Sequence, residues 1–476
     1  MAKQPHAVML PFPAIGHLSP MLNLAGLLAS RDILVTFVNT EFIHDRMFKS
    51  APNDHNIRFQ TISDGLPDDH NRSFDPTHQM MRSVTGTAGI YFEKLVEKLR
   101  ASSDDVPPIS CIIGDTFLPF AQDIAQKYDI PGMAFWACSA CSLSVHFHTD
   151  LLVQKGYIPL QVHTGKTRGG RCEEEDEIIS CIPGMSQLRV RDVPSSLLEE
   201  DSSYFMNHHL KMATNRSGEA AQVLLFNTSE ELDAPILESL RTKFEVLSVG
   251  PLLPLAFMGD SGASGGHMRA EEKRIAPPSA NEDSGCLQWL DEQERCSVVF
   301  VSFGSVARFS KEQLEELAWG LEASNQPFLW VYGQSALLPQ QFLTRTKQRS
   351  CFVSWAPQLK VLLHPSVGCY LTHCGWNSTI ESIYAGVPLV CWPFFADNHV
   401  NRRLLVDVWK MGVELNDRNI CREDITRSVK MVIIGDEGAH IRKRCNDLKI
   451  SVRNATNKGG SSYVNFDKLV KIIMKN

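Results

Sequence analysis

The stretch WAPQLKVLLHPSVGCYLTHCGWNSTIESIYAGVPLVCWPFFADN, residues 355–398, decides how this chain folds. Within it, the apolar run 367–371 predicts a buried strand, and 377–386 has the pattern of a helix that ends at a glycine. Asn377 and Ser378 are residue types that cap helices, so we expect them at the helix start. A strand that leads into a helix N-terminus favours anion binding, because backbone N–H groups and the positive end of the helix dipole meet there. The stretch therefore predicts a phosphate site.

Other residues of this stretch match the remaining parts of a nucleotide-diphospho-sugar. Trp355 offers a flat face to a base. Glu381, one turn into the helix, can accept two hydrogen bonds from a ribose diol. Asp397 and Asn398 follow a further strand, where ligands bind in open α/β sheets, and their side chains suit sugar hydroxyls. We infer a nucleotide-diphospho-sugar site.

Outside this stretch, strand patterns alternate with helical ones. The strand patterns are apolar without alternation, as expected for strands buried on both faces. Ser310 and Gln313 form a capping-box pattern before the helix 311–324. These patterns predict an α/β fold with parallel, doubly wound sheets in two Rossmann-like halves facing a cleft. The expected strands are 7–11, 33–40, 109–115, 131–136, 297–305, 328–332, 351–355, 367–373 and 388–393.

Composition excludes several classes of protein. The chain has 476 residues, of which 43% are hydrophobic and 21% charged, so it is globular. The net charge is −7, from 47 Lys and Arg against 54 Asp and Glu, which speaks against nucleic-acid binding. No signal peptide or membrane-spanning run is apparent, and thirteen cysteines without a disulfide pattern suit a reducing compartment. We expect a soluble, cytoplasmic protein.

The stretch 355–398 closely resembles the signature box of plant family-1 UDP-dependent glycosyltransferases, from its opening Trp-Ala-Pro-Gln to its closing acid–amide pair. Three other segments are similar to family segments and stand in the family order. They are PFPAIGHLSP (11–20), CLQWLDEQERCSVVFVSFGSVARFS (286–310) and GGSSYVNFDKLV (459–470). The resemblance implies a GT-B fold, in which two facing Rossmann-like domains are separated by a cleft and the final helix returns to the first domain.

The expected domain boundaries follow from this resemblance and from composition. Residues 1–250 form an acceptor-binding domain, on which the final helix 456–476 packs, and residues 286–455 form the UDP-sugar-binding domain. Between them, 251–285 is rich in Gly, Ser and Pro and is expected to be a linker or loop.

The resemblance also implies the donor contacts. Trp355 stacks on uracil, the backbone of Ala356 pairs with the edge of the base, and Gln358 and Glu381 hold the ribose. The diphosphate is assigned to residues around the helix N-terminus and the SFGS turn, namely His373, Gly375, Asn377, Ser378, Gly304 and Ser305.

The sugar itself is assigned to Trp376, Asp397 and Asn398. The family box usually ends in Gln for glucose transfer, and here Asn398 keeps the amide on an arm one methylene shorter. Glucose is the expected sugar, and a pentose or a broader donor range stays open. Relatives that transfer glucuronate often carry Arg where this chain has Trp376, which argues against UDP-glucuronate.

His17 and Asp115 are the expected catalytic pair. His17 is predicted in the turn after the first strand, just before a helix, and Asp115 ends the strand 109–115. Both therefore lie at the carboxyl edge of a parallel sheet. A histidine can act as the base, while a carboxylate on its second ring nitrogen fixes the tautomer. The same His and Asp occupy the catalytic positions of the resembling family, which implies inversion in a single displacement. Ile15 replaces the usual Gln of the family's Gln-Gly-His motif.

The acceptor pocket is expected mainly in the first domain, and for each of its aromatic residues core packing is an equally open interpretation. The candidates are Ile15, Phe117, Phe120, Trp136, His146 and Phe395. The expected acceptor is a small apolar secondary metabolite with a nucleophilic hydroxyl, such as a phenolic, flavonoid, terpenoid or iridoid.

The sequence also bears on cofactors, oligomeric state and alternative functions. UDP-sugar is a co-substrate, and neither a cofactor nor a metal is expected, since the CxxC at 138–141 and the pair His146 and His148 lack metal-ligand spacing. A monomer is expected. A C-glycosyltransferase and a non-catalytic UDP-sugar sensor stay open. A nicotinamide-dependent oxidoreductase is disfavoured, because no Gly-X-Gly-X-X-Gly follows the first strand.

Overall fold

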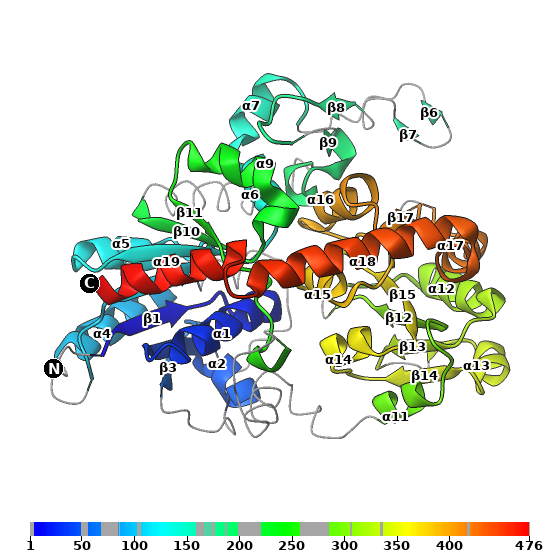
Figure 1. Cartoon of the computed structure of the whole chain (residues 1–476), viewed down its shortest axis with the longest axis horizontal. Helices are drawn as coiled ribbons and strands as arrows, with labels where there is room; N and C mark the ends of the chain where they lie inside the picture. Colours follow the sequence, from blue (N-terminus) through cyan, green and yellow to red (C-terminus); the bar gives the residue numbers. More distant parts are fainter. Residues whose placement is uncertain are drawn as a thin grey trace. The chain divides into compact units, whose positions relative to one another are not determined.

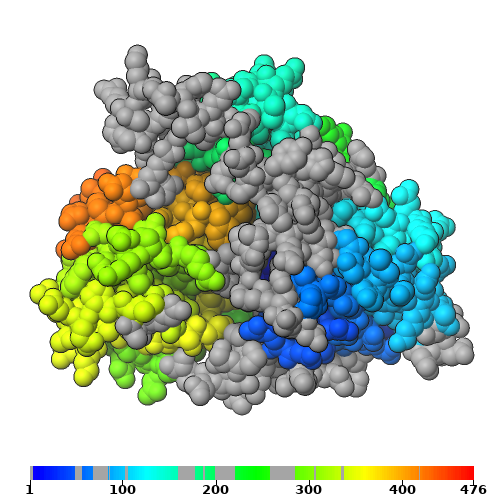
Figure 2. All heavy atoms as spheres, turned by 180° about the vertical axis from the view of Figure 1, so that it is seen from behind, coloured from blue at the N-terminus to red at the C-terminus, as the bar shows by residue number. Residues whose placement is uncertain are grey.

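The structure is a computed structural model, and the residues that it does not describe are grey in Figures 1 and 2. The chain forms two compact units, which are described separately below. The described residues are 4–48, 56–67, 84, 86–101, 106–158, 167–168, 171–172, 177–185, 188–198, 220–257, 285–304, 307–333, 337–416 and 419–475.

The first unit comprises Met1–Val190, Ser196–Pro278 and Asn454–Asn476. Its centre is a seven-stranded sheet of order β11-β10-β5-β4-β1-β2-β3, in which all neighbours are parallel. Two short antiparallel pairs, β6–β7 and β8–β9, lie outside this sheet. The strands are β1 (His6–Leu10), β2 (Leu34–Thr40), β3 (Ile57–Ile62), β4 (Cys111–Asp115), β5 (Gly132–Trp136), β6 (Thr167–Arg168), β7 (Arg171–Cys172), β8 (Ile178–Ile179), β9 (Leu188–Arg189), β10 (Val223–Phe226) and β11 (Val246–Ser248).

Helices cover both faces of the first sheet (Figure 1). Apolar residues of α1 and α19 pack in one core cluster, and those of α4 and α5 pack in another. Helix α19 is held to the end of β11 by polar contacts as well, since Asn465 Nδ2 donates to Ser248 O at 3.1 Å. The α-helices of this unit are α1 (Ile15–Ala29), α2 (Glu41–Ile43), α4 (Ala88–Ala101), α5 (Phe120–Lys127), α6 (Ala140–Phe147), α7 (Thr149–Gln154), α9 (Glu230–Arg241) and α19 (Ser461–Lys475).

The second unit comprises Arg191–Ser195 and Ser279–Arg453. Its six-stranded sheet is also entirely parallel, in the order β14-β13-β12-β15-β16-β17. The strands are β12 (Val298–Ser302), β13 (Phe328–Val331), β14 (Ser350–Val353), β15 (Val367–Thr372), β16 (Leu389–Cys391) and β17 (Gly412–Glu414). The α-helices are α11 (Cys286–Asp291), α12 (Lys311–Ser324), α13 (Gln340–Thr346), α14 (Gln358–Leu363), α15 (Trp376–Ala385), α16 (Asn398–Arg403), α17 (Arg422–Ile434) and α18 (Asp436–Thr456), whose last residues belong to the first unit.

The two sheets share one topology. Numbered within its own sheet, each begins in the order 3-2-1-4-5-6, which is the doubly wound arrangement of Rossmann folds. The strand order reverses between β1 and β4 in the first unit and between β12 and β15 in the second. Loops that follow these strand pairs leave the sheet in opposite directions, which is why ligands bind there. The predicted parallel α/β fold is confirmed for both units.

Several local predictions can be compared with the observed elements. The capping box of Ser310 and Gln313 is present at the start of α12. Most of the predicted linker 251–285 lies outside the described residues. The prediction that His17 precedes its helix is wrong, because α1 begins at Ile15 and places His17 in its first turn. Pro20 is tolerated inside this helix, since its fixed φ is helical and its missing N–H costs one bond near the helix start.

Among the helices that the structure describes, none is long and apolar enough to cross a membrane.

Acid is predicted to destabilise the first unit through the buried His6. Its Nε2 lies 2.8 Å from Thr36 Oγ1 and its Nδ1 lies 3.0 Å from Pro107 O. Burial lowers the pKa of His6 to about 4, against a partly compensating hydrogen bond to Pro107 and with a small lowering effect from the Arg58 charge. In the unfolded chain His6 is therefore protonated below about pH 6.5, whereas in the folded chain it is protonated only below about pH 4.

We expect the urea midpoint of the first unit to fall as the pH drops through this window, with a loss on the order of 2 kcal/mol from His6 by pH 4.5. In His6→Gln the slope of stability against pH should be shallower between pH 6.5 and 4.5. An unchanged slope would show that His6 is not a source of the acid sensitivity.

Candidate active site

His17 and Asp115 meet where the strand order of the first sheet reverses. His17 Nδ1 lies 2.7 Å from Asp115 Oδ2. The other carboxylate oxygen, Oδ1, accepts a hydrogen bond from Phe117 N at 2.9 Å. The Asp115 side chain is fully buried, whereas 13% of the His17 side chain is exposed. Because a carboxylate can only accept, this contact places the proton of a neutral His17 on Nδ1 and leaves Nε2 with its lone pair.

Local packing explains why these two side chains meet. In β4, a Cβ at Gly114 would come within 2.5 Å of Ala121 Cβ, so glycine allows α5 to pack closely against the strand that delivers Asp115. The His17 ring packs against two aromatic rings that also contact each other, with ring centroids 5.2 Å from Phe12 and 4.7 Å from Phe117. The position of the imidazole is therefore defined by packing and by the carboxylate.

A row of rings continues from His17 through predicted acceptor residues. Ring centroids of Phe117 and Trp136 are 5.7 Å apart, and those of Trp136 and His146 are 6.1 Å apart. His146 is buried, which lowers its pKa to about 4, and its Nδ1 has no hydrogen-bond partner among the described residues. Ile15 is 45% exposed and lies two residues from His17.

The remaining acceptor candidates are not part of this row. Phe120 packs against Phe92, with ring centroids 6.2 Å apart, in the core beneath α4. Phe395 belongs to the second unit. Of the six candidates, Phe117, Trp136 and His146 form a continuous ring cluster beside the predicted catalytic pair.

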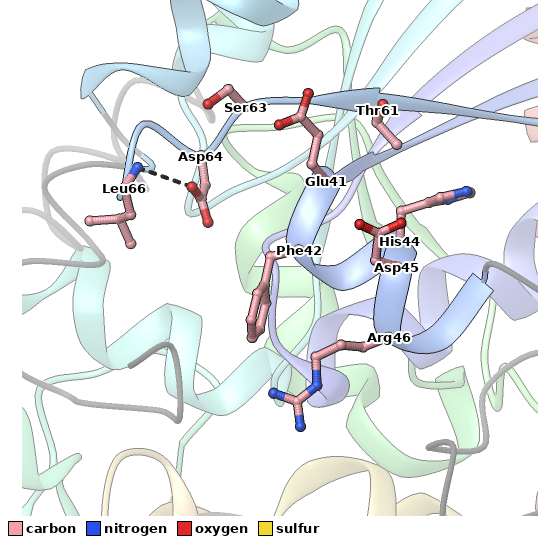
Figure 3. Close-up of a pocket in the computed structure, with 9 residues that line it drawn as sticks. All are labelled: Glu41, Phe42, His44, Asp45, Arg46, Thr61, Ser63, Asp64 and Leu66. Atoms are coloured by element: carbon pink, nitrogen blue, oxygen red, sulfur yellow. Dashed lines mark hydrogen bonds between the residues drawn. The ribbon is translucent and has the colours of Figure 1, made fainter. Parts of the chain in front are cut away.

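A separate pocket of about 410 Å³ lies at the carboxyl ends of β2 and β3 (Figure 3). Figure 3 shows α2 on one side of it and the chain that leaves β3 on the other. None of the predicted acceptor residues lines it, and its many acidic groups do not suit an apolar acceptor. Its lining residues are Glu41, Phe42, His44, Asp45, Arg46, Thr61, Ser63, Asp64 and Leu66.

In the second unit, the predicted diphosphate residues gather where the strand order reverses. Gly304 follows β12 with a φ of +67°, and His373 and Gly375 follow β15. A Cβ at Gly304 would lie 3.0 Å from His373 Nε2, and one at Gly375 would lie 2.4 Å from it. Both glycines are therefore required for the imidazole to sit between the two turns. Ser305, which was also predicted here, lies outside the described residues.

Helix α15 begins one residue earlier than the sequence pattern indicates. Its N-cap is Gly375 and its first residue is Trp376, so the prediction that Asn377 and Ser378 cap the helix is wrong. The sharp turn after β15, in which Cys374 has a φ of +66°, brings the chain into the helix early. The first helical hydrogen bond runs from Thr379 N to Gly375 O. The expected termination at Gly386 is confirmed, with a left-handed φ of +76°.

The predicted ribose residues form one hydrogen-bonded group. Gln358 Nε2 donates to Glu381 Oε2 at 2.8 Å and to Ser378 Oγ at 2.9 Å. Tyr370 completes the group, since its hydroxyl donates to Gln358 Oε1 at 3.0 Å. Sequence reasoning placed Tyr370 in a strand and gave it no role in the site. No sequence pattern indicates that its buried hydroxyl bonds a predicted ribose residue. Burial raises the pKa of Glu381 to about 7, against the opposing effect of the Gln358 hydrogen bond.

The predicted base residues lie at the start of α14. Trp355 is half-buried and Ala356 is buried, three and two residues before Gln358. The Trp355 ring therefore keeps an accessible surface on which a base can stack.

The three predicted sugar residues differ in how much of each side chain is accessible to a ligand. Trp376 is 4% exposed and packs against Trp409, so little of its ring remains for a ligand. Asn398 is 2% exposed, and its Nδ2 donates to His373 O at 2.7 Å. Asp397 is half-buried and accepts from Asn401 Nδ2 at 2.9 Å. Asp397 thus offers the most accessible polar group of the three.

Among the described residues, no group of three or more His, Cys, Asp or Glu side chains is arranged to hold a metal ion.

Comparisons with known proteins identify the family. Residues 280–440 match the family model "UDP-glucoronosyl and UDP-glucosyl transferase", and residues 5–148 match "Glycosyltransferase, N-terminal domain". The chain is 37% identical to 7-deoxyloganetin glucosyltransferase of Catharanthus roseus, over 99% of this chain and 97% of that protein. It is 38% identical to (R)-mandelonitrile beta-glucosyltransferase of Prunus dulcis, over 99% and 98% of the two chains.

A solved structure with a similar fold is UDP-glucose: anthocyanidin 3-O-glucosyltransferase in complex with UDP. It superposes with a TM-score of 0.84 and 30% identity, covering 100% of both chains. The fold is therefore GT-B, and the chain belongs to the UDP-glycosyltransferase family of enzymes. The resemblance inferred from the signature box is confirmed.

Proposed function

We propose that this enzyme transfers glucose from UDP-glucose, with inversion, to a hydroxyl group of a small secondary metabolite. The observation that carries the proposal is the buried His17–Asp115 pair at the strand-order reversal of the first sheet. Family membership supports the UDP-sugar donor. The similar proteins named as glucosyltransferases support glucose as the sugar.

In this mechanism His17 Nε2 accepts the proton of the acceptor hydroxyl while the oxygen attacks the anomeric carbon. A new carbon–oxygen bond forms, and the bond from the same carbon to the UDP oxygen breaks. Asp115 Oδ2 lies 2.7 Å from His17 Nδ1, accepts the hydrogen bond from Nδ1–H and stabilises the imidazolium that results. A single displacement inverts the anomeric centre, so an α-linked donor gives a β-glucoside.

The leaving UDP is proposed to be stabilised by the turn between β15 and α15. The N-terminus of α15 places backbone N–H groups and the positive end of a helix dipole there. Burial lowers the pKa of His373 to about 4, against the opposing effect of a hydrogen bond that the ring donates to the Ser302 backbone carbonyl, so the ring is neutral at pH 7. His373 is proposed to face the diphosphate, and the single N–H of its neutral ring can donate either to Ser302 O or to a phosphate oxygen. These groups supply the charge stabilisation that a metal provides elsewhere, so we propose metal-independent transfer.

Asp397 and Asn398 are proposed to recognise the sugar hydroxyls, with Gln358 and Glu381 on the ribose and Trp355 on uracil. The acceptor is proposed to lie along the ring cluster of Phe117, Trp136 and His146. We further propose a monomeric, cytoplasmic enzyme. No disulfide joins the cysteines in the part of the chain that the structure describes, which suits a reducing compartment.

The base assignment predicts that His17→Ala lowers kcat by at least about a hundredfold, the usual range for removing a general base. Asp115→Asn should also lower kcat, because the amide no longer favours the Nδ1–H tautomer. The dissociation constant for UDP should stay unchanged in both variants, since the proposed donor residues belong to the second unit. Mass spectrometry with UDP-glucose and pooled phenolic, terpenoid and iridoid acceptors measures transfer, with and without chelator.

Transfer that survives in His17→Ala would exclude His17 as the base. An acid-stable product would indicate C-linkage, and UDP binding without transfer to any acceptor would favour a sensor.

The pKa of Glu381 predicts a pH dependence of UDP binding. The pKa is raised to about 7, so the side chain becomes a carboxylate as the pH rises from 6 to 8. The carboxylate accepts on both oxygens, whereas the protonated acid carries a proton on one of them and pairs less well with the two ribose hydroxyls. Affinity for UDP, measured by calorimetry, should therefore increase over this range and level off near pH 8. Glu381→Gln should bind more weakly and show a flatter profile; a wild-type profile in that variant would contradict the ribose assignment.

The Asn398 assignment predicts that Asn398→Gln retains glucose transfer from UDP-glucose, because the amide group is kept on a longer arm. Asn398→Ala should instead lower kcat/KM, since it loses the hydrogen bond to His373 O. Initial rates with UDP-glucose, UDP-galactose and UDP-xylose test both variants. Complete loss of glucose transfer in Asn398→Gln would count against the placement of this residue at the sugar.

A further inference from the structure

Residues Arg191–Ser195 belong to the second unit, although the chain on both sides of them belongs to the first. Within this segment, Asp192 is fully buried and pairs with Arg402, which is itself 1% exposed. Arg402 Nη1 also lies 2.9 Å from Glu414 Oε2, and Arg403 Nε lies 3.8 Å from the second oxygen of Asp192. Buried charges are stable only when they are paired, so this network defines where the segment lies.

The same segment holds the turn that precedes α16. Ser195 N donates to Ala396 O at 3.2 Å, and Ala396 N donates to Ser195 Oγ at 2.9 Å. Ala396 has a φ of +51°, a left-handed conformation that is unfavourable for a non-glycine residue. The two hydrogen bonds with Ser195 supply the support that such a conformation needs.

These two sets of contacts lie at opposite ends of one short element. Helix α16 has six residues, begins at Asn398 and ends with Arg402 and Arg403. Asp192 therefore holds its C-terminal end, while Ser195 holds the turn directly before Asp397. Asn401 Nδ2 links the interior of α16 to Asp397 Oδ2 at 2.9 Å and to Cys374 O at 2.9 Å. The position of Asp397 thus depends on a segment some 200 residues away in sequence.

We propose that Ser195 and Asp192 are positioning residues for donor-sugar recognition: they hold Asp397 and Asn398 where these meet the sugar. The inference rests on the proposed function, in which those two residues contact the sugar. It implies that the segment affects recognition of the sugar and leaves recognition of the UDP part unchanged.

The test compares Ser195→Ala with Ser195→Thr, which keeps the hydroxyl. Ser195→Ala should raise KM for UDP-glucose about tenfold, as loss of one hydrogen bond implies. The Kd for UDP alone should change less than about twofold, because no donor contact to UDP depends on Ser195 in this account. Ser195→Thr should restore KM. Ser196→Ala is the matched control, since among the described residues no hydrogen bond involves the Ser196 side chain.

Asp192→Asn provides a second variant, with Asp407→Asn as its control. Asp407 pairs with Arg403 through Nη1, whereas Asp192 lies nearest to Nε of the same side chain. Asp192→Asn should raise KM for UDP-glucose more than Asp407→Asn does. If Asp192→Asn fails to fold, the three serine variants decide the question by themselves.

The outcomes separate the inference from the proposed function. An inactive wild-type protein with every donor would overturn the proposed function. An active wild type with unchanged KM in Ser195→Ala would overturn only the inference. Equal changes in KM for UDP-glucose and in Kd for UDP would show a general structural role and would also overturn it. Asp397→Ala must itself raise KM for UDP-glucose; if it does not, the inference loses the sugar contact on which it rests.

Discussion

The reversal of strand order in each parallel sheet is the constraint on which the rest of the structure depends. Beside β1 and beside β12, neighbouring strands send their following loops to opposite faces of the sheet, and the carboxyl edge opens between them. His17 and Asp115 follow β1 and β4 at the first reversal. Gly304 and His373 follow β12 and β15 at the second. One topological rule, applied twice, places the proposed base and the proposed diphosphate site.

Burial then determines the chemistry of the groups at these edges. Asp115 is buried, yet both its oxygens accept hydrogen bonds, so its charge is compensated and directed at His17. His373 is neutral because burial lowers its pKa, which makes it a hydrogen-bonding partner for an anion without adding a charge. At Glu381 burial raises the pKa to about 7, so this residue can respond to pH. The proposed donor site thus relies on oriented dipoles and hydrogen bonds more than on cationic side chains.

The sequence predicted the strands whose residues are apolar on both faces, because such runs have few alternatives in an α/β protein. It missed β3, where exposed and buried residues mix in IRFQTI, and the short strands β10, β11 and β17. The sequence analysis placed the starts of the helices at Ile15 and Trp376 too late. Pro20 looks like part of a turn before the first helix, and the turn at Cys374 gives no sequence signal for the early start of the second. The signature box supplied nearly every donor residue. The hydroxyl of Tyr370 and the contacts of Ser195 with Ala396 depend on tertiary packing, which local patterns do not contain.

A crystal structure of this chain with UDP tests the central claim most directly, because the claim concerns where the strand-order reversal places the diphosphate. The account predicts phosphate oxygens about 3 Å from the first backbone N–H groups of α15 and next to the His373 ring. It also predicts the ribose hydroxyls on Glu381 and uracil on Trp355. UDP bound elsewhere, or with its phosphates away from the β12–β15 reversal, would contradict the account.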